Sequence, residues 1–298
     1  MSTRINPNTV PDLLSAMETN QKNVQNAAQE VSTGRRVNNL GDDPAAVAAL
    51  VFNNAQSSQD AQFQTNISDV QSKVQVADSV MNSAVQLMTS AISLGTQGAT
   101  GTLTDANRQA IAAQVSGLQQ QMLSLANTSY QGTYIFSGTD VTTQPFAEDT
   151  SAPSGVVYNG NSAVTTVQIS QGQSLQTNLS GDQVFSNSSG NVFAALNDLK
   201  NALTSGTGIA AANTEVQAAF NQLNNQRVFY GNALNQLQST ERFLSQDTVN
   251  LSQQQNSLIG ADLSKAVSDL SLSQTAEQAS ISAMAQILNL PTLLNYIK

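Results

Sequence analysis

The chain has 298 residues with no Cys, His or Trp, and only 10% of them are charged, with 20 acidic and 11 basic side chains and a formal charge of −9. Without Cys or His the sequence excludes disulfides, iron–sulfur clusters, thiol nucleophiles, imidazole metal sites and Ser-His-Asp triads. The excess of acid argues against a nucleic-acid-binding protein, and no apolar run is long enough to cross a bilayer.

The apolar residues favour thin packing over one large compact core. They make up 40% of the chain and are mostly Ala, Val and Leu, whereas aromatic residues are only 5%. The first predicted helix spans about residues 10–33, where apolar or small side chains recur every three or four positions. Gly34 is a natural helix stop.

A second helix is predicted to begin at Pro44, because Asp43 can cap free N–H groups and Pro suits the first helical position. It should run to about Leu94, since Gly95–Gly101 reads as a loop. A helix of this length needs a long partner.

The amino-acid composition changes in the middle of the chain. A third helix opens near Thr104, but from about Tyr130 onwards Gly, Ser, Thr and Asn become frequent. Short runs typical of strands occur at Thr133–Phe136, Gly155–Tyr158 and Val164–Ile169, separated by turn residues. We interpret this part as a small β-rich insertion.

Helical periodicity resumes at Asn191, and a very long helix is predicted to begin near Thr214, which fits a capping box with Gln217. An apolar residue then recurs every seven positions, at Leu223, Tyr230, Leu237, Leu244, Leu251 and Leu258. A coiled coil needs a second apolar position in each heptad, but that position is polar at Arg227, Glu241, Thr248 and Gln255. A two-stranded coiled coil is therefore insufficient, and several helices should share the rod.

The predicted fold is mainly α: an elongated, coiled-coil-like antiparallel helical rod built from both chain ends, with a small β-rich domain inserted in the middle. We expect terminal helices in residues 1–38 plus 262–298 and a helical rod in residues 39–130 plus 190–261. The β-rich outer domain should cover residues 131–189.

Candidate catalytic and binding motifs are weak. Asp42 and Asp43 are better explained as helix caps than as metal ligands. Arg35 and Arg36 are better explained as partners of a helix C-terminus or of local acids than as a clamp for an anion. The Gly206–Gly208 segment follows a helix and so reads as a loop, not a dinucleotide site. We expect no enzyme, cofactor or metal; a carboxylate-based hydrolase on a helical scaffold is a distant alternative.

The terminal apolar stripes have few partners within one chain, and isolated helices are marginal without packing. We therefore expect them to be buried in an assembly. The proposed assembly interface consists of Leu14, Met17, Val24, Val31, Ile281, Met284, Leu288, Leu293, Leu294, Tyr296 and Ile297.

Four segments carry a family resemblance. The stretch VSTGRRVN from Val31 to Asn38, followed by DDPAA from Asp42 to Ala46, resembles the N-terminal signature of bacterial flagellins. The segment GTYIFSGT at 132–139 and the ending LLNYI at 293–297 are similar to the members of that family that join hook and filament. Filament flagellin is the alternative within the family.

The resemblance implies a structural axial protein of the bacterial flagellum that lets flagellin assemble. It implies a secreted, extracellular protein at the hook–filament junction, delivered by type III export with a cytoplasmic chaperone and needed for motility. The implied partners are copies of itself in a ring or layer, the other junction protein and flagellin, with no nucleic acid and no membrane insertion.

Overall fold

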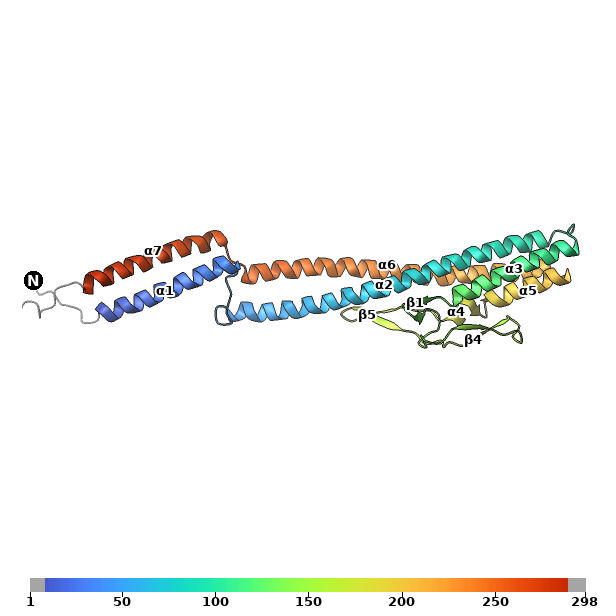
Figure 1. The fold of residues 1–298 in the computed structure, drawn as a ribbon, viewed down its shortest axis with the longest axis horizontal. Coiled ribbons are helices and arrows are strands. Elements are labelled where there is room, and N and C mark those ends of the chain that lie inside the picture. The colour runs from blue at the N-terminus through green and yellow to red at the C-terminus, as the bar shows by residue number, and fades with distance from the viewer. Residues whose placement is uncertain (1–8, 289–298) are drawn as a thin grey trace, which may run out of the picture. The chain divides into compact units, whose positions relative to one another are not determined.

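The computed structural model describes residues 9–288, and the side-chain surroundings of residues 11–286. This part of the chain is mainly helical, with seven α-helices and four short antiparallel strand pairs (Figure 1). The helices are α1 (Thr9–Thr33), α2 (Pro44–Gly98), α3 (Asp105–Ala126), α4 (Gly181–Phe185), α5 (Val192–Ser205), α6 (Ile209–Ile259) and α7 (Leu263–Leu288). The predicted mainly α fold with a β-rich insertion is confirmed.

The chain divides into two compact units, and both chain halves contribute to each. The first unit combines Met1–Ser58 with Asp247–Lys298, and the second is Gln59–Gln246. Helices α2 and α6 therefore contribute residues to both units.

In the first unit, α1 and α7 pack side by side in opposite directions, drawn in blue and red in Figure 1. The Asn20 amide of α1 donates to the Ser280 hydroxyl at 2.8 Å and to the Ala276 carbonyl at 3.4 Å. At the other end of the pair, the amide of Ala261 donates to the Gly34 carbonyl at 3.0 Å. These contacts fix an antiparallel register.

The start of α2 confirms the predicted cap. The Asp43 carboxylate accepts the Ala46 amide at 3.0 Å, and Pro44 is the first helical residue. Asp42 instead organises the preceding loop, because its carboxylate accepts the amides of Asn38 at 2.9 Å and Asn39 at 2.7 Å.

The second unit has an apolar core shared by α2, α3, α5 and α6. An apolar stripe of α2 is buried at every position: Ile67, Val70, Val74, Ala77, Met81, Ala84 and Met88. In the heptad series of α6, Leu223, Tyr230, Leu237 and Leu244 are buried in this unit. Arg227, one of the polar heptad residues, places its Nε 3.0 Å from the Asp78 carboxylate on α2.

The predicted loop at Gly95–Gly101 is wrong in its first half, because α2 continues to Gly98. A Cβ atom at Gly95 would overlap the side chain of Asn213, and one at Gly98 would overlap Leu203. These glycines therefore allow close helix packing instead of ending the helix.

The predicted start of the long helix near Thr214 is also wrong. Helix α6 begins at Ile209, and the Thr214 hydroxyl donates to the Ala210 carbonyl at 3.0 Å inside the helix. Burial of Ile209 and Ala212 stabilises the earlier start.

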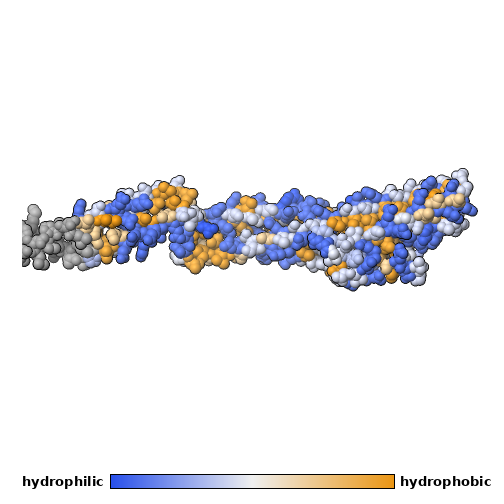
Figure 2. Space-filling view, in the orientation of Figure 1, coloured by the Kyte–Doolittle hydropathy of each residue, from blue (hydrophilic) through white to orange (hydrophobic). Residues whose placement is uncertain are grey.

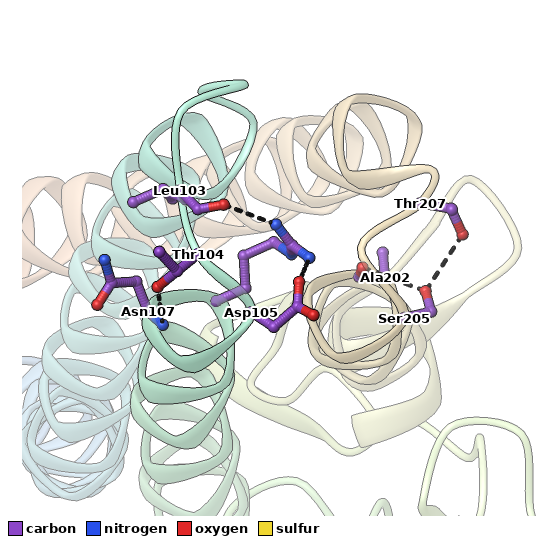
Figure 3. Close-up of polar contacts among 8 residues, drawn as sticks. Leu103, Thr104, Asp105, Asn107, Ala202, Ser205 and Thr207 are labelled. Carbon is purple, nitrogen blue, oxygen red and sulfur yellow. Dashed lines mark hydrogen bonds and ion pairs between the residues drawn. The ribbon is translucent and has the colours of Figure 1, made fainter.

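The Gly206–Gly208 segment is the turn between α5 and α6, as the loop interpretation predicted. Gly206 adopts φ 77° and caps α5. Figure 3 shows Ser205 and Thr207 at this turn, opposite Thr104 and Asp105 at the start of α3. The Arg108 side chain donates to the Leu103 carbonyl at 2.9 Å and pairs with Asp105.

The β-rich insertion consists of hairpins whose larger aromatic side chains pack toward α5. Phe136, Phe146 and Phe185 are buried together with Phe193 of α5, and the rings of Phe146 and Phe193 lie 5.1 Å apart. The strands pair as β1–β2 (Ser129–Tyr130, Thr133–Tyr134), β3–β4 (Phe146–Glu148, Val156–Tyr158), β5–β6 (Thr166–Ser170, Gln173–Gln176) and β7–β8 (Ser186–Asn187, Gly190–Asn191).

Candidate assembly interface

The α1–α7 pair buries very little of its own apolar surface. Among the described side chains of the two helices, residues 11–33 and 263–286, only Ala27 and Ala266 are buried. Two small residues cannot supply the burial that normally stabilises a helix pair in water. The pair therefore presents apolar side chains that a further partner could cover.

The structure places the predicted interface residues on this pair without enclosing them. Leu14 is 44% exposed and Ile281 is 52% exposed. Met17, Val24, Val31 and Met284 are half-buried. Leu288 is the last residue of α7, and its side-chain surroundings lie outside the described part, as do Leu293, Leu294, Tyr296 and Ile297 altogether.

Sequence reasoning missed part of this surface. Leu263 and Val267 are both exposed on α7. Together with Ile281 they share one face, because spacings of four and eighteen residues bring helical side chains within about 40° of each other around the axis. Helical periodicity groups them with Ile281, but it does not show which side of α7 meets α1. Figure 2 shows apolar residues at the surface over the first turns of α7.

The hydrogen bonds between the side chains of α1 and the described residues of α7 come from one uncharged amide. Asn20 supplies the hydrogen bonds to Ser280 and Ala276, and no ion pair among the described residues joins the two helices. An amide and a hydroxyl can pair without the desolvation cost of a buried charge.

Beyond α1 and α7, the adjoining connections are held by charge-assisted contacts. The Arg36 guanidinium lies 3.0 Å from the Asp43 carboxylate. The Ala46 amide, and then Arg36, hold the pKa of Asp43 below its usual value. This assigns Arg36 the structural role predicted for it.

The alternative of a carboxylate hydrolase requires convergent acids with pKa values set apart. A cavity of about 350 Å³ in the second unit is lined by one carboxylate, Glu148, among amides, hydroxyls and Lys200. A cavity of about 270 Å³ in the first unit holds Glu30 and Asp42, but the amides of Asn39 and Asn38 lower the pKa of Asp42. That carboxylate is thus held in its ionised form, which does not suit a general acid.

The described part of the chain holds neither a metal cluster nor a helix able to span a membrane. The described residues contain no group of three or more acidic, His or Cys side chains able to hold a metal ion. None of the described helices combines the length and apolar character needed to cross a bilayer.

Comparison with known proteins gives the family. Residues 6–141 match the bacterial flagellin N-terminal helical region, and residues 214–297 match the bacterial flagellin C-terminal helical region. The flagellar hook-associated protein 3 of Escherichia coli is 30% identical over 286 residues, 87% of this chain and 88% of the relative. A flagellin of Bacillus subtilis is 25% identical over 300 residues, 95% of each chain.

A solved structure gives the same fold. The flagellar junction protein FlgL from Legionella pneumophila superposes with a TM-score of 0.62 at 15% identity, covering 71% of this chain and all of that one. The two flagellin regions, the hook-associated relative and the shared fold lead to one conclusion: the chain belongs to the bacterial flagellin family and is a structural protein of the flagellum.

Proposed function

We propose that this protein is an adaptor between the hook and the filament, and that its α1–α7 pair is the surface through which it is built into the flagellum. The observation that carries the proposal is the nearly coreless α1–α7 pair, which leaves Leu14, Leu263, Val267 and Ile281 exposed. Relatedness to hook-associated protein 3 supports the junction position.

We assign a different part of the proposed axial structure to each region of the chain. Residues 1–38 and 262–298 would form the wall of an axial tube, residues 39–130 and 190–261 the helical rod, and residues 131–189 an outer domain. The contrast in burial supports this division, since side chains that lack a core inside one molecule gain most from neighbours.

The proposed partners are further copies of this chain in a ring or layer, the other junction protein on the hook side and flagellin on the filament side. We also propose passage through the flagellar type III export channel with a cytoplasmic chaperone, which makes the protein secreted and extracellular. The role is structural and not catalytic. Membership of the bacterial flagellin family supports that choice.

Filament flagellin is the second candidate, favoured by the nearly full-length relatedness to the Bacillus subtilis flagellin. Flagellin would be present in many copies and would build the filament itself. A junction protein would be present in few copies and would only start the filament.

Electron microscopy of cells that lack this protein tests the proposal. The adaptor predicts hooks without filaments, with flagellin released into the medium, and recovery when the gene is supplied again. Normal filaments in the deletion strain would contradict it. Missing filaments without any released flagellin would instead identify the chain as the filament subunit.

A further inference from the structure

The two connections that join α1 to α2 and α6 to α7 are tied together. The Arg36 amide donates to the Ile259 carbonyl at 2.7 Å, and the Ala261 amide donates to the Gly34 carbonyl at 3.0 Å. Arg35 and Gly260 form an isolated antiparallel bridge between these two bonds. We call residues 34–36 and 259–261 the clasp.

The backbone of the clasp depends on glycine. Gly34 ends α1 with φ at 66°, a left-handed conformation that other residues rarely adopt. A Cβ atom at Gly260 would overlap the Asn256 carbonyl. The two glycines thus permit the local backbone turns with which α1 and α6 end at the clasp.

One side chain links both connections to the helices beyond them. The Arg36 guanidinium donates to the Asp43 carboxylate at 3.0 Å and to the Leu258 carbonyl at 2.9 Å. Asp43 caps the first turn of α2, and Leu258 lies in the last turn of α6. A cation suits the free carbonyls of a helix C-terminus, and a carboxylate suits the free amides of an N-terminus.

The apolar support at this place is small. Val37, Ala46 and Ile259 form a separate buried cluster beside the clasp. The α1–α7 pair itself buries only Ala27 and Ala266 among its described side chains. Few contacts other than the clasp and this cluster therefore hold the pair to the adjoining ends of α2 and α6.

We propose that Arg36 is a positioning residue, which closes the clasp and so holds the α1–α7 pair to residues 44–58 and 247–259. The structural part of this inference is independent of the proposed adaptor role. Its consequence for assembly rests on that role, because a misplaced α1–α7 pair would present its apolar face wrongly to neighbours.

Hydrogen exchange of the full chain tests the clasp. In Arg36→Gln, the amides of residue 36 and Ala261 should exchange about fivefold faster, as expected for a partly exposed charged contact. The matched control is Arg35→Gln, which removes the same charge from a neighbouring exposed side chain that forms no ion pair among the described residues. Equal exchange in the two variants would overturn the proposal.

Asp43→Asn separates the charge pair from the helix cap, because Asn is also a good N-cap residue. It should speed exchange at Ala261 while leaving the Ala46 amide protected. In the double variant Arg36→Gln/Asp43→Asn the effects should be less than additive, since both changes break one contact. Full additivity would show that Arg36 does not act through Asp43.

A functional readout tests positioning. Faster exchange in Arg36→Gln together with weaker swimming than Arg35→Gln supports the proposal. Faster exchange with unchanged swimming contradicts the positioning role. Failure of the adaptor role is detected separately, by normal filaments in the deletion strain, and leaves the exchange result valid.

Discussion

The core of the second unit and the α1–α7 pair share the same apolar periodicity but bury it very differently. In the second unit, α2, α3, α5 and α6 surround one cluster, and residues such as Met81, Met88, Leu223 and Leu237 have no exposed surface. In the α1–α7 pair, Ala27 and Ala266 are the only buried side chains among those described, and the larger apolar side chains in the described range are exposed or half-buried.

The difference teaches that a helical stripe predicts a buried face but not what buries it. A stripe enclosed by four helices becomes a core within one molecule. A stripe on a two-helix pair leaves much of its area open, and that open area is available to other subunits.

The largest change in stability is expected from a substitution in the enclosed core of the second unit. Leu237→Ala should lower the free energy of unfolding by about 2–5 kcal/mol, because it opens a cavity at a fully buried site. Leu272→Ala on α7 is the matched control, and since Leu272 is 70% exposed, the change should stay within about 0.5 kcal/mol. Urea denaturation measures both, and similar losses would erase the contrast between the two regions.

A smaller effect tests how closely the core helices pack. Gly95→Ala should cost about 1–3 kcal/mol, because its Cβ would overlap the buried Asn213 side chain. Gly231→Ala in α6 has open space around the new methyl group, so it should stabilise the helix by about 0.5–1 kcal/mol. Thermal melting would refute the packing argument if both substitutions changed stability in the same direction.

The smallest effect is a pH dependence confined to the second unit. Burial raises the pKa of Tyr158 from 10.0 to about 12. Because the folded pKa lies above the ordinary value, the neutral phenol contributes full stability below pH 10, and this contribution is lost as pH rises through 12.

Tyr158→Phe removes the hydroxyl that donates to the carbonyls of Phe136 and Asn161. The variant should therefore be less stable than the wild type at neutral pH. The gap between the two should shrink as pH rises above 10 in denaturation curves. A constant gap up to pH 12 would contradict this account of Tyr158.

Much of the fold was predictable because local signals and packing agree. The cap at Asp43 and the return of helix near Asn191 follow from short-range chemistry, and the apolar stripe of α2 follows from helical periodicity. The structural role of Arg36 was also predictable, since charges near helix ends pair with local acids.

The failures share one cause, which is that a partner far away in sequence decided the outcome. Gly95 looks like a helix stop until the nearby Asn213 is known, and Thr214 looks like a cap until Ile209 is seen to be buried. The predicted interface was affected in the same way. The exposure of Leu263 and Val267 depends on which side of α7 meets α1, and the periodicity does not specify that side.

Complementation of a deletion strain with Val267→Gln/Ile281→Gln tests the assembly surface most directly. The control Val164→Gln changes an equally exposed valine in the β-rich region. The account predicts that the double variant melts like the wild type yet fails to restore filaments and swimming, whereas Val164→Gln restores both. Wild-type filaments and swimming with the double variant would contradict the claim that this face of α7 is an assembly surface.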